Sequence, residues 1–416
     1  MKNRALDLIG AGAILIACAA SSLFAAEPRL QYVAILSRHG VRSPTWTPER
    51  LNQYSAQPWP NFGVPPGDLT PHGRGLIKLL GAYYGEWLGN EHLLGPTSCR
   101  DAERIYIWAD SDQRTIATGR AFAESVLPGC GVSAHSRPQG DRDPLFSGSR
   151  SNNLEAAADA VKQRLGPDPQ KVLSEQRQAL ATLQFILTAG HDTPKKVLDG
   201  QPKIGAIIQG AGVELQGPFA VGSALSEDLL LEYAEGMSGD NLGWGRLNTQ
   251  NLFEVLALHR IYADLMRRTP ELARARSSNL LKTLAASLQQ ASSGKPVPGA
   301  LGSPKTAMLL LAGHDTNQSN VSGMLGLSWA LPGYQRDETP PGGALVFSLW
   351  RDERGRDFVR LEFLAASLDQ MRDSERLSLA HPPLRQRIGL QNCPVAQDQP
   401  ECSLEDFNQI IRRATE

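Results

Sequence analysis

The sequence has almost no net charge, because 42 Lys and Arg residues balance 43 Asp and Glu residues to a formal −1 at pH 7. Bulk charge therefore gives no reason to expect nucleic acid or another polyanion as a partner. The eight histidines form no tight cluster of His or Asp residues with ligand spacing, which argues against a metal-dependent hydrolase. Internal repeats and low-complexity segments are absent as well. We expect neither a metal nor another cofactor.

Cysteine is also scarce, and one of the five cysteines, Cys18, lies in an N-terminal segment typical of export signals. Two basic residues, Lys2 and Arg4, precede an apolar stretch at 8–20, and small residues follow it. We predict a signal peptide at 1–26 and a periplasmic mature chain. The sequence LIAC that ends at Cys18 is also typical of lipoprotein signals, so the alternative is a chain anchored to the membrane by a lipid on Cys18.

The segment 37–45, SRHGVRSPT, places a histidine between two arginines directly after the apolar run 32–36. The run predicts a buried parallel strand that ends at the histidine. The neutral ring of His39 offers a nucleophilic nitrogen, while Arg38 and Arg42 can each donate two hydrogen bonds to phosphoryl oxygens. An exposed basic turn is the alternative for this segment taken alone.

Two further apolar runs end in the same way. The run 105–109 is followed by Arg114, and the run 307–311 is followed by His314 and Asp315. Ligands of open parallel sheets bind at the carboxyl ends of the strands. If these three strands are parallel neighbours, their polar side chains converge with the histidine and arginines described above on one phosphate-binding crevice.

These residues resemble the histidine acid phosphatase family, branch 2 of the histidine phosphatase superfamily, and within it the bacterial periplasmic phytases and acid phosphatases. The resemblance extends over nearly the whole mature chain. It rests on the motifs RHGVRSP at 38–44, GWGR at 243–246, RTPELARAR at 268–276, HDTN at 314–317 and TPPGG at 339–343.

The resemblance implies a phosphomonoesterase that works without a cofactor. His39 would attack phosphorus and become a phosphohistidine, and Asp315 would protonate the departing alcohol and later activate the water. Because a carboxyl group donates its proton best in acid, we expect an acid-shifted rate profile. The residues that would hold the phosphoryl oxygens are Arg38, Arg42, Arg114 and His314.

The substrate is less strongly indicated than the reaction. By resemblance, Thr45 binds substrate, Trp46 stands where similar phytases carry a lysine, Asp240 or a neighbour is an acidic residue at the entrance, and Arg276 reaches a peripheral phosphate. We expect a phytase that acts on inositol hexakisphosphate. The alternatives are a sugar phosphatase of the glucose 1-phosphate type, a broad-specificity acid phosphatase, a phosphotransferase or mutase, and a noncatalytic phosphate-binding protein.

The expected fold is an α/β domain with a mainly parallel sheet flanked by helices and a phosphoglycerate mutase-like core. Residues 28–141 and 297–416 would form this domain, and 142–296, which has helical periodicity, would be an inserted, mostly helical domain. We expect a monomer. The four cysteines other than Cys18 allow three pairings. The family's pattern pairs Cys99 with Cys130 and Cys393 with Cys402.

The segment AGHDT at 189–193 copies the motif around Asp315, but it follows a sequence of helical composition rather than a strand. We therefore predict that His191 and Asp192 are surface loop residues. Ser111 and Asp112 are expected to cap the helix that begins near Arg114 rather than to contact substrate.

Overall fold

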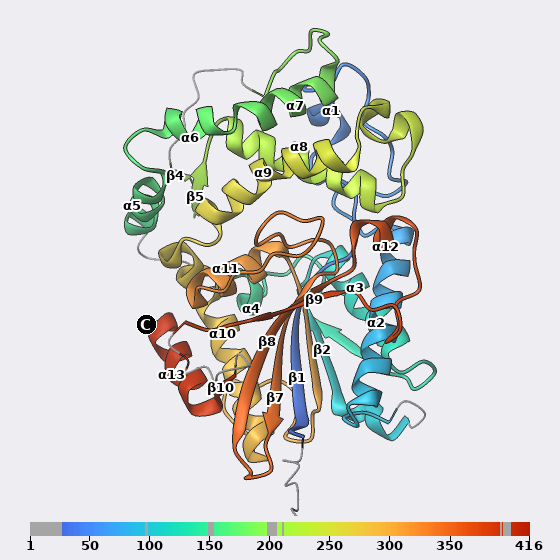
Figure 1. Cartoon of the computed structure of the whole chain (residues 1–416), viewed down its shortest axis with the longest axis vertical. Coiled ribbons are helices and arrows are strands. Elements are labelled where there is room, and N and C mark those ends of the chain that lie inside the picture. Colours follow the sequence, from blue (N-terminus) through green and yellow to red (C-terminus); the bar gives the residue numbers. More distant parts are fainter. Residues whose placement is uncertain are drawn as a thin grey trace, which may run out of the picture.

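The computed structural model describes residues 27–95, 99–148, 154–197, 206–209, 212–391, 393 and 401–416. The predicted signal peptide with Cys18 lies outside the described residues. Figure 1 shows a sheet flanked by helices, with a second, mostly helical part beyond one end of the strands. Among the described helices, none has the length and apolar character needed to cross a bilayer.

The strands are β1 (Arg29–Arg38), β2 (Ile105–Ala109), β3 (Ala134–Ser136), β4 (Ala206–Gln209), β5 (Gly212–Leu215), β6 (Met308–Gly313), β7 (Ala344–Arg351), β8 (Asp357–Ala365), β9 (Leu384–Ile388) and β10 (Cys402–Ser403). The α-helices are α1 (Pro48–Leu51), α2 (Pro71–Asn90), α3 (Gln113–Val126), α4 (Pro144–Ser147), α5 (Leu154–Leu165), α6 (Pro169–Glu175), α7 (Arg177–Thr188), α8 (Pro218–Ala234), α9 (Thr249–Met266), α10 (Pro270–Ser293), α11 (Asp315–Leu325), α12 (Leu368–Arg372) and α13 (Leu404–Thr415). The described residues also form the 3₁₀ helices η1 (Cys99–Arg104), η2 (Gly239–Asn241) and η3 (Gly243–Gly245).

The central sheet has the strand order β10-β8-β7-β1-β6-β2-β3, and β9 pairs with β8. The three strands expected to be parallel neighbours are β1, β6 and β2, and this prediction is confirmed. All six residues of β6 are buried, as expected for a central strand with helices on both faces. The predicted α/β fold is thus confirmed, with helices flanking the sheet and with β1, β6, β2 and β3 parallel to one another.

The other half of the sheet is antiparallel. Strands β7 and β8 pair antiparallel, as do β1 and β7. The connection between β7 and β8 spans only 352–356, which is too short to bring the chain back for a parallel pairing.

Helices α2 and α3 cover one face of the sheet, and α10, α11 and α13 cover the other (Figure 1). Helices α5 to α9 form the mostly helical part beyond the carboxyl ends of β1, β6 and β2 (Figure 1). Helix α10 contacts β1 and α11, although its residues fall within the segment 142–296. The domain bounds 28–141, 297–416 and 142–296 remain a proposal.

Two disulfides join Cys99 to Cys130 and Cys393 to Cys402, in agreement with the pairing that the resemblance implied. The first bond ties η1, which leads into β2, to the end of α3. It therefore braces β2 and α3, the strand and the helix that present Arg114.

Helix α2 begins at Pro71 with Thr70 as its N-cap, and the Thr70 hydroxyl accepts a hydrogen bond from the Gly73 amide at 2.8 Å. Gly73 lies directly against the backbone of Val41, in the loop that carries His39. A Cβ atom at position 73 would overlap the carbonyl oxygen of Val41. The first turn of α2 thus fixes the position of this loop.

We expect the substitution G73A to push the 39–42 loop out of place and to destabilise the fold by about 1–3 kcal/mol, as overpacked core substitutions do. Turnover should fall with it, because the loop carries His39 and Arg42. Urea unfolding and phosphatase rates measure the two effects. Gly75, which has open space around the position of a Cβ atom on the same helix, offers the matched control G75A. Equal behaviour of the two variants would contradict the packing argument.

Candidate active site

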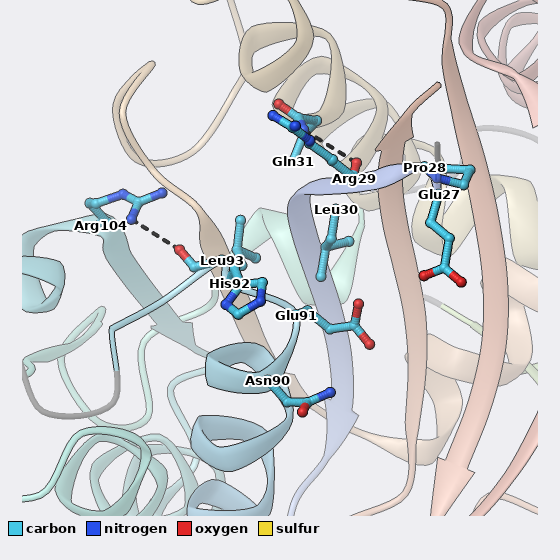
Figure 2. Close-up of a pocket in the computed structure, with 10 residues that line it drawn as sticks. All are labelled: Glu27, Pro28, Arg29, Leu30, Gln31, Asn90, Glu91, His92, Leu93 and Arg104. Carbon is cyan, nitrogen blue, oxygen red and sulfur yellow. Dashed lines mark hydrogen bonds between the residues drawn. The ribbon is translucent and has the colours of Figure 1, made fainter. Parts of the chain in front are cut away.

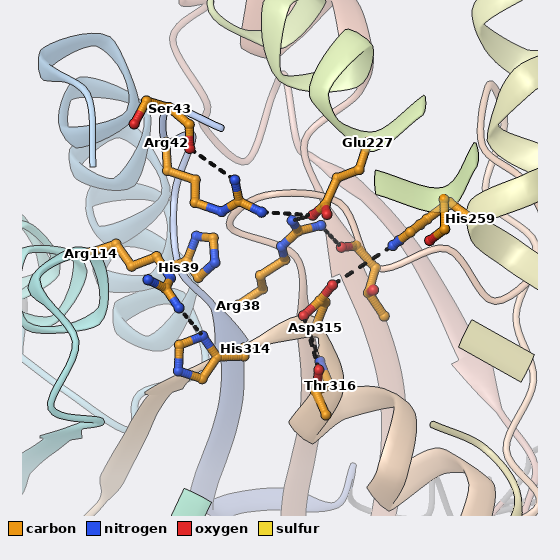
Figure 3. Close-up of polar contacts among 12 residues, drawn as sticks. Arg38, His39, Arg42, Ser43, Arg114, Glu227, His259, His314, Asp315 and Thr316 are labelled. Carbon is orange, nitrogen blue, oxygen red and sulfur yellow. Dashed lines mark hydrogen bonds and ion pairs between the residues drawn. The ribbon is translucent and has the colours of Figure 1, made fainter. Parts of the chain in front are cut away.

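The polar residues predicted to converge do lie together at the carboxyl ends of β1, β6 and β2 (Figure 3). Arg38 ends β1 and stands in register with Gly313, the last residue of β6. The amide of His39 donates to the carbonyl of Gly313 at 2.9 Å. The rings of His39 and His314, which follow these two strands, meet edge to face with centroids 5.6 Å apart.

His39 has only one nitrogen free to react. Its Nδ1 lies 2.8 Å from the carbonyl oxygen of Gly40, and because a carbonyl only accepts hydrogen bonds, Nδ1 carries the ring proton. The lone pair is therefore on Nε2. Burial, followed by the charges of Arg38, Arg114 and Arg42, holds the pKa of His39 well below its usual value. The ring is neutral, as a nucleophile must be.

Arg38 and Arg42 share one carboxylate partner, Glu227 from α8. An Arg38 Nη2 hydrogen bond reaches Glu227, and Arg42 Nη2 lies 3.3 Å from the same oxygen. Arg38 also donates to the carbonyl of Thr339 at 2.7 Å, and Arg42 to that of Ser43 at 2.9 Å. Burial alone would raise the pKa of Glu227, but Arg42 and Arg38 lower it to about 2. The ionised Glu227 orients both guanidinium groups before any substrate arrives.

Arg114 and His314 form the other side of the site. Arg114 Nη2 lies 3.4 Å from His314 Nδ1, and His314 Nε2 lies 2.8 Å from a carboxylate oxygen of Asp110. Because that oxygen only accepts, Nε2 carries a proton and Nδ1 faces the guanidinium group. Asp110, at the end of β2, thereby fixes the orientation of the His314 ring.

The predicted capping role of Ser111 and Asp112 is wrong. Asp112 is the N-cap residue of α3 but makes no side-chain cap hydrogen bond. Its carboxylate instead pairs with Arg114 at 2.5 Å and lies 3.6 Å from His314 Nε2, while the Ser111 hydroxyl donates to the carbonyl of Asp141. An arginine in the first turn is unfavourable for the helix dipole, and the carboxylate of Asp112 offsets that charge.

Asp315 is the first residue of α11 and is 8 % exposed. Its Oδ1 accepts a hydrogen bond from the Thr316 amide at 2.7 Å, and its Oδ2 forms an ion pair with Arg267. The Nε2 of His259, from α9, lies 3.8 Å from the same Oδ2. Burial would raise the pKa of Asp315, but Arg267, Arg38 and His259 outweigh it and hold the pKa well below the usual value. The carboxylate is ionised in the free protein.

The four residues expected to contact substrate differ in position. Thr45 is exposed and close to Arg114, since a Cβ atom on Gly67 would be 3.6 Å from both side chains. Trp46 is half-buried, with the Arg50 guanidinium 3.6 Å from its ring centre. It borders a cavity of about 320 Å³ whose other lining residues include Pro44, Trp59, Pro60 and Phe62.

Asp240 is exposed on η2, and its place at the entrance stays a prediction, while Glu227 is an acidic residue beside the arginines. Arg276 donates to the carbonyl of Met266 at 2.9 Å and lies near enough to Arg267 for their charges to interact. His191 and Asp192 of the copied motif are exposed just beyond α7, as predicted.

The sequence motifs did not identify Glu227, His259 and Arg267. All three come from α8 or α9 and their ends, outside the strand ends from which the site was predicted. One local signal was present: the pair Glu227–Asp228 lies within the otherwise uncharged stretch 225–231 of α8, where an unpaired charge would be costly if the stretch were buried.

One group of three potential metal ligands occurs within the described part of the chain, formed by Glu227, His259 and Asp315. Both carboxylates are already paired with arginines, and His259 Nδ1 lies 3.0 Å from Glu338. Guanidinium groups therefore occupy the places where a cation would bind, so these residues do not fit a metal ion.

A larger cavity, of about 780 Å³, lies at the opposite end of the sheet, where β1 begins and α2 ends (Figure 2). Its lining residues are Glu27, Pro28, Arg29, Leu30, Gln31, Asn90, Glu91, His92, Leu93 and Arg104. None of the predicted phosphate-binding residues is among them. This cavity is therefore not the candidate active site, which lies at the other end of β1.

Comparison with known proteins agrees with this site. The family model described as histidine phosphatase superfamily (branch 2) matches residues 29–198 and 227–363. The chain is 34% identical to phytase AppA of Escherichia coli (strain K12) over 420 residues, 96% of each chain. It is 30% identical to glucose-1-phosphatase of Salmonella typhimurium over 433 residues, 100% of each chain.

Among solved structures, the Hafnia alvei phytase in complex with tartrate has a TM-score of 0.85 and 34% identity, and the match covers 94% of this chain and 98% of that one. A phytase from Citrobacter braakii also has a TM-score of 0.85, with 33% identity, and covers 93% of this chain and 98% of that one. The family model matches most of the chain, and the two relatives match 96% and 100% of it. Both comparisons assign the chain to the same family. The chain belongs to branch 2 of the histidine phosphatase superfamily and is a phosphoric monoester hydrolase.

Proposed function

We propose that the protein hydrolyses phosphomonoesters in two steps through a phosphohistidine on His39. The Nε2 lone pair of His39 forms a bond to phosphorus while the bond from phosphorus to the alcohol oxygen breaks, and Asp315 gives that oxygen its proton. Water then attacks phosphorus, Asp315 takes up a proton from the water, and the bonding pair returns to Nε2. The products are an alcohol and inorganic phosphate.

The observation that carries this proposal is the neutral Nε2 of His39 among three guanidinium groups, those of Arg38, Arg42 and Arg114. Fixed positive charges stabilise the equatorial phosphoryl oxygens as charge moves during transfer. His314, oriented by Asp110, lies beside Arg114 on the other side of the site. Glu227 gives up its arginine contacts to the incoming phosphate.

The ionised state of Asp315 in the free protein gives the reaction a definite pH dependence. A proton donor must be protonated, so the fraction of competent enzyme rises as the pH falls toward the low pKa of Asp315. A bound phosphate dianion adds negative charge beside Arg38 and raises the pKa of Asp315, so Asp315 is protonated more easily in the complex. The rate of alkyl ester hydrolysis should therefore be highest in acid.

For the substrate, we propose inositol hexakisphosphate, with release of phosphate and lower inositol phosphates. Support comes from the E. coli and H. alvei relatives, both named phytases, and from Arg276, a further arginine near Arg267 that a multiply phosphorylated substrate would use. A sugar monophosphate is the second candidate. The relative named glucose-1-phosphatase favours it, as does Trp46, whose ring can stack on a sugar.

The choice between phytate and a sugar monophosphate is tested by measuring kcat/KM in acid on phytate, glucose 1-phosphate and an aryl phosphate. We expect the largest value on phytate. The variant W46K adds a cation at the rim and should raise the value on phytate relative to glucose 1-phosphate. A wild-type preference for glucose 1-phosphate of ten-fold or more would assign the protein to the second candidate.

We also propose that the mature chain acts as a periplasmic monomer on small-molecule phosphomonoesters, without nucleic acid partners. The signal-like segment 1–26 and the two disulfides, which persist in oxidising compartments, support this location. Intact-mass analysis of the purified chain tests the alternative, since a diacylglycerol retained on Cys18 would place the protein on a membrane.

A further inference from the structure

Asp315 lies between two cations that the phosphoryl-transfer chemistry itself does not require. We propose that Arg267 is a positioning residue that keeps Asp315 ionised in the free enzyme and thereby sets the upper pH limit for hydrolysis of alkyl phosphates. The proposal rests on the proposed role of Asp315 as proton donor. It goes beyond that role because it assigns control of the donor to a residue that touches neither phosphorus nor the leaving group.

The contact between Arg267 and Asp315 is enclosed and rigid. Their side chains are only 14 % and 11 % exposed, and Arg267 Nη1 bonds to Asp315 Oδ2. The guanidinium carbon of Arg267 also lies 5.8 Å from the ring centre of Tyr262, five residues earlier in α9. Little water reaches the pair, so the charge of Arg267 acts on the carboxylate with little screening.

The backbone fixes this geometry as well. Arg267 directly follows α9, and its amide donates to the carbonyl of Ala263 at 2.9 Å. The next residue, Arg268, packs against Gly323 of α11 so closely that a Cβ atom on Gly323 would be 2.6 Å from the Arg268 backbone. Because Asp315 begins α11, the end of α9 and the start of the proton-donor helix are held in one arrangement.

His259 is the second cation beside Asp315. Its Nδ1 lies 3.0 Å from buried Glu338, and its Nε2 faces Asp315 Oδ2 at 3.8 Å. Burial would lower the pKa of His259, but Glu338 and Asp315 raise it to about 9, so the ring is protonated throughout the acidic range. Two cations from the helical part therefore act on one carboxylate.

The charges that act on Asp315 from other elements do not cancel this pair. Glu227 is an anion and works against the two cations, but its own charge is paired with Arg38 and Arg42. The charged groups that act on Asp315 are Arg38 from β1, Arg114 from α3, Glu227 from α8, His259 from α9, and Arg267. Four cations and one anion favour the ionised carboxylate. Among these cations, Arg267 is bonded directly to it.

The consequence depends on the leaving group. An alkoxide leaves only when it receives a proton, whereas a nitrophenolate leaves without one, so the state of Asp315 matters only for the alkyl ester. The pH dependence of kcat/KM reports the free enzyme. For an alkyl ester, the basic limb of the pH profile of kcat/KM should therefore follow the ionisation of Asp315. Removal of the Arg267 charge should move that limb to higher pH.

The test compares kcat/KM from pH 3 to 8 for glycerol 2-phosphate and 4-nitrophenyl phosphate in the wild type, R267Q and R267K. For R267Q we expect the basic limb with glycerol 2-phosphate to move up by about one unit or more, the size of shift that a close opposite charge produces. The limb with 4-nitrophenyl phosphate should stay in place. R267K keeps the charge, so both of its limbs should remain near those of the wild type.

R164Q is a matched control, because Arg164 pairs with Asp264 at 2.8 Å near the same end of α9 without contacting Asp315. Its limbs should not move. An R267Q limb that stays in place for the alkyl ester, or that moves equally for both esters, overturns the proposal. Wild-type protein gives a test without any variant: a ratio of alkyl to aryl kcat/KM that is constant across this pH range also overturns it.

Failure of this proposal is distinguishable from failure of the proposed function. If wild-type enzyme forms no phosphohistidine on His39, the proposed reaction itself is wrong. If the phosphohistidine forms while the R267Q limb is unchanged, only the assignment of Arg267 fails.

Discussion

Substitution of His39 by Gln should reduce phosphate release by about 10⁴-fold or more, because no other described group in the site can form the covalent bond to phosphorus. The ring of His39 is neutral, and its Nε2 atom, which carries the lone pair, lies among Arg38, Arg42 and Arg114. The glutamine side chain is polar and of similar length, and it can keep a hydrogen bond to the carbonyl of Gly40. We therefore expect the fold to persist and substrate binding to remain measurable.

The loss is measured in two ways: by steady-state phosphate release, and by trapping ³²P from labelled substrate on the protein in alkali, since the phosphorus–nitrogen bond of phosphohistidine is labile in acid. Wild-type protein should carry the label, and H39Q should not. H191Q is the matched control, because His191 lies in the copied AGHDT segment but is exposed beyond α7. Hydrolysis by H39Q at a rate near that of the wild type would rule out His39 as the nucleophile.

The placement of His39, Arg114 and Asp315 in one site was predictable because each follows an apolar run of strand length. Parallel strands end at the same edge of a sheet, so three separate stretches of sequence, once read as neighbouring strands, place their next residues together. Strands β1, β6 and β2 are such neighbours. The distance of about 200 residues between Arg114 and His314 therefore did not hide their contact.

The electrostatic partners of these residues could not be predicted in the same way. Glu227, His259 and Arg267 come from helices whose position over the sheet edge depends on packing between distant segments, such as Gly323 against Arg268. No short-range pattern encodes that packing. Glu227 lies inside α8, where no motif marks it.

The helix cap at Asp112 shows the same limit. Asp is favoured at an N-cap, and the sequence correctly located the helix start. Because Arg114 lies two residues further on and His314 lies just beyond β6, the Asp112 carboxylate pairs with these side chains rather than with the free amides of the helix. Tertiary charges thus overrode a local preference.

Substitution of Asp315 by Asn should separate the two halves of the reaction. Asparagine has nearly the same shape but cannot give a proton to an alkoxide, so kcat/KM on glycerol 2-phosphate should fall by about 10²–10⁴-fold. The first turnover of 4-nitrophenyl phosphate should remain much faster, because nitrophenolate needs no proton. Without a carboxylate to take up a proton from water, the phosphohistidine should then accumulate.

Rapid mixing measures this as a burst of nitrophenolate followed by slow turnover, and alkaline quenching measures the phosphohistidine itself. D192N is the matched control, because Asp192 occupies the same place in the copied AGHDT segment and is exposed. The thermal stability of both variants should be measured as well, since D315N also leaves the largely enclosed Arg267 without its anionic partner. Equal losses on the alkyl and aryl esters would remove Asp315 from proton donation and leave its ion pair with Arg267 as a structural feature of the site.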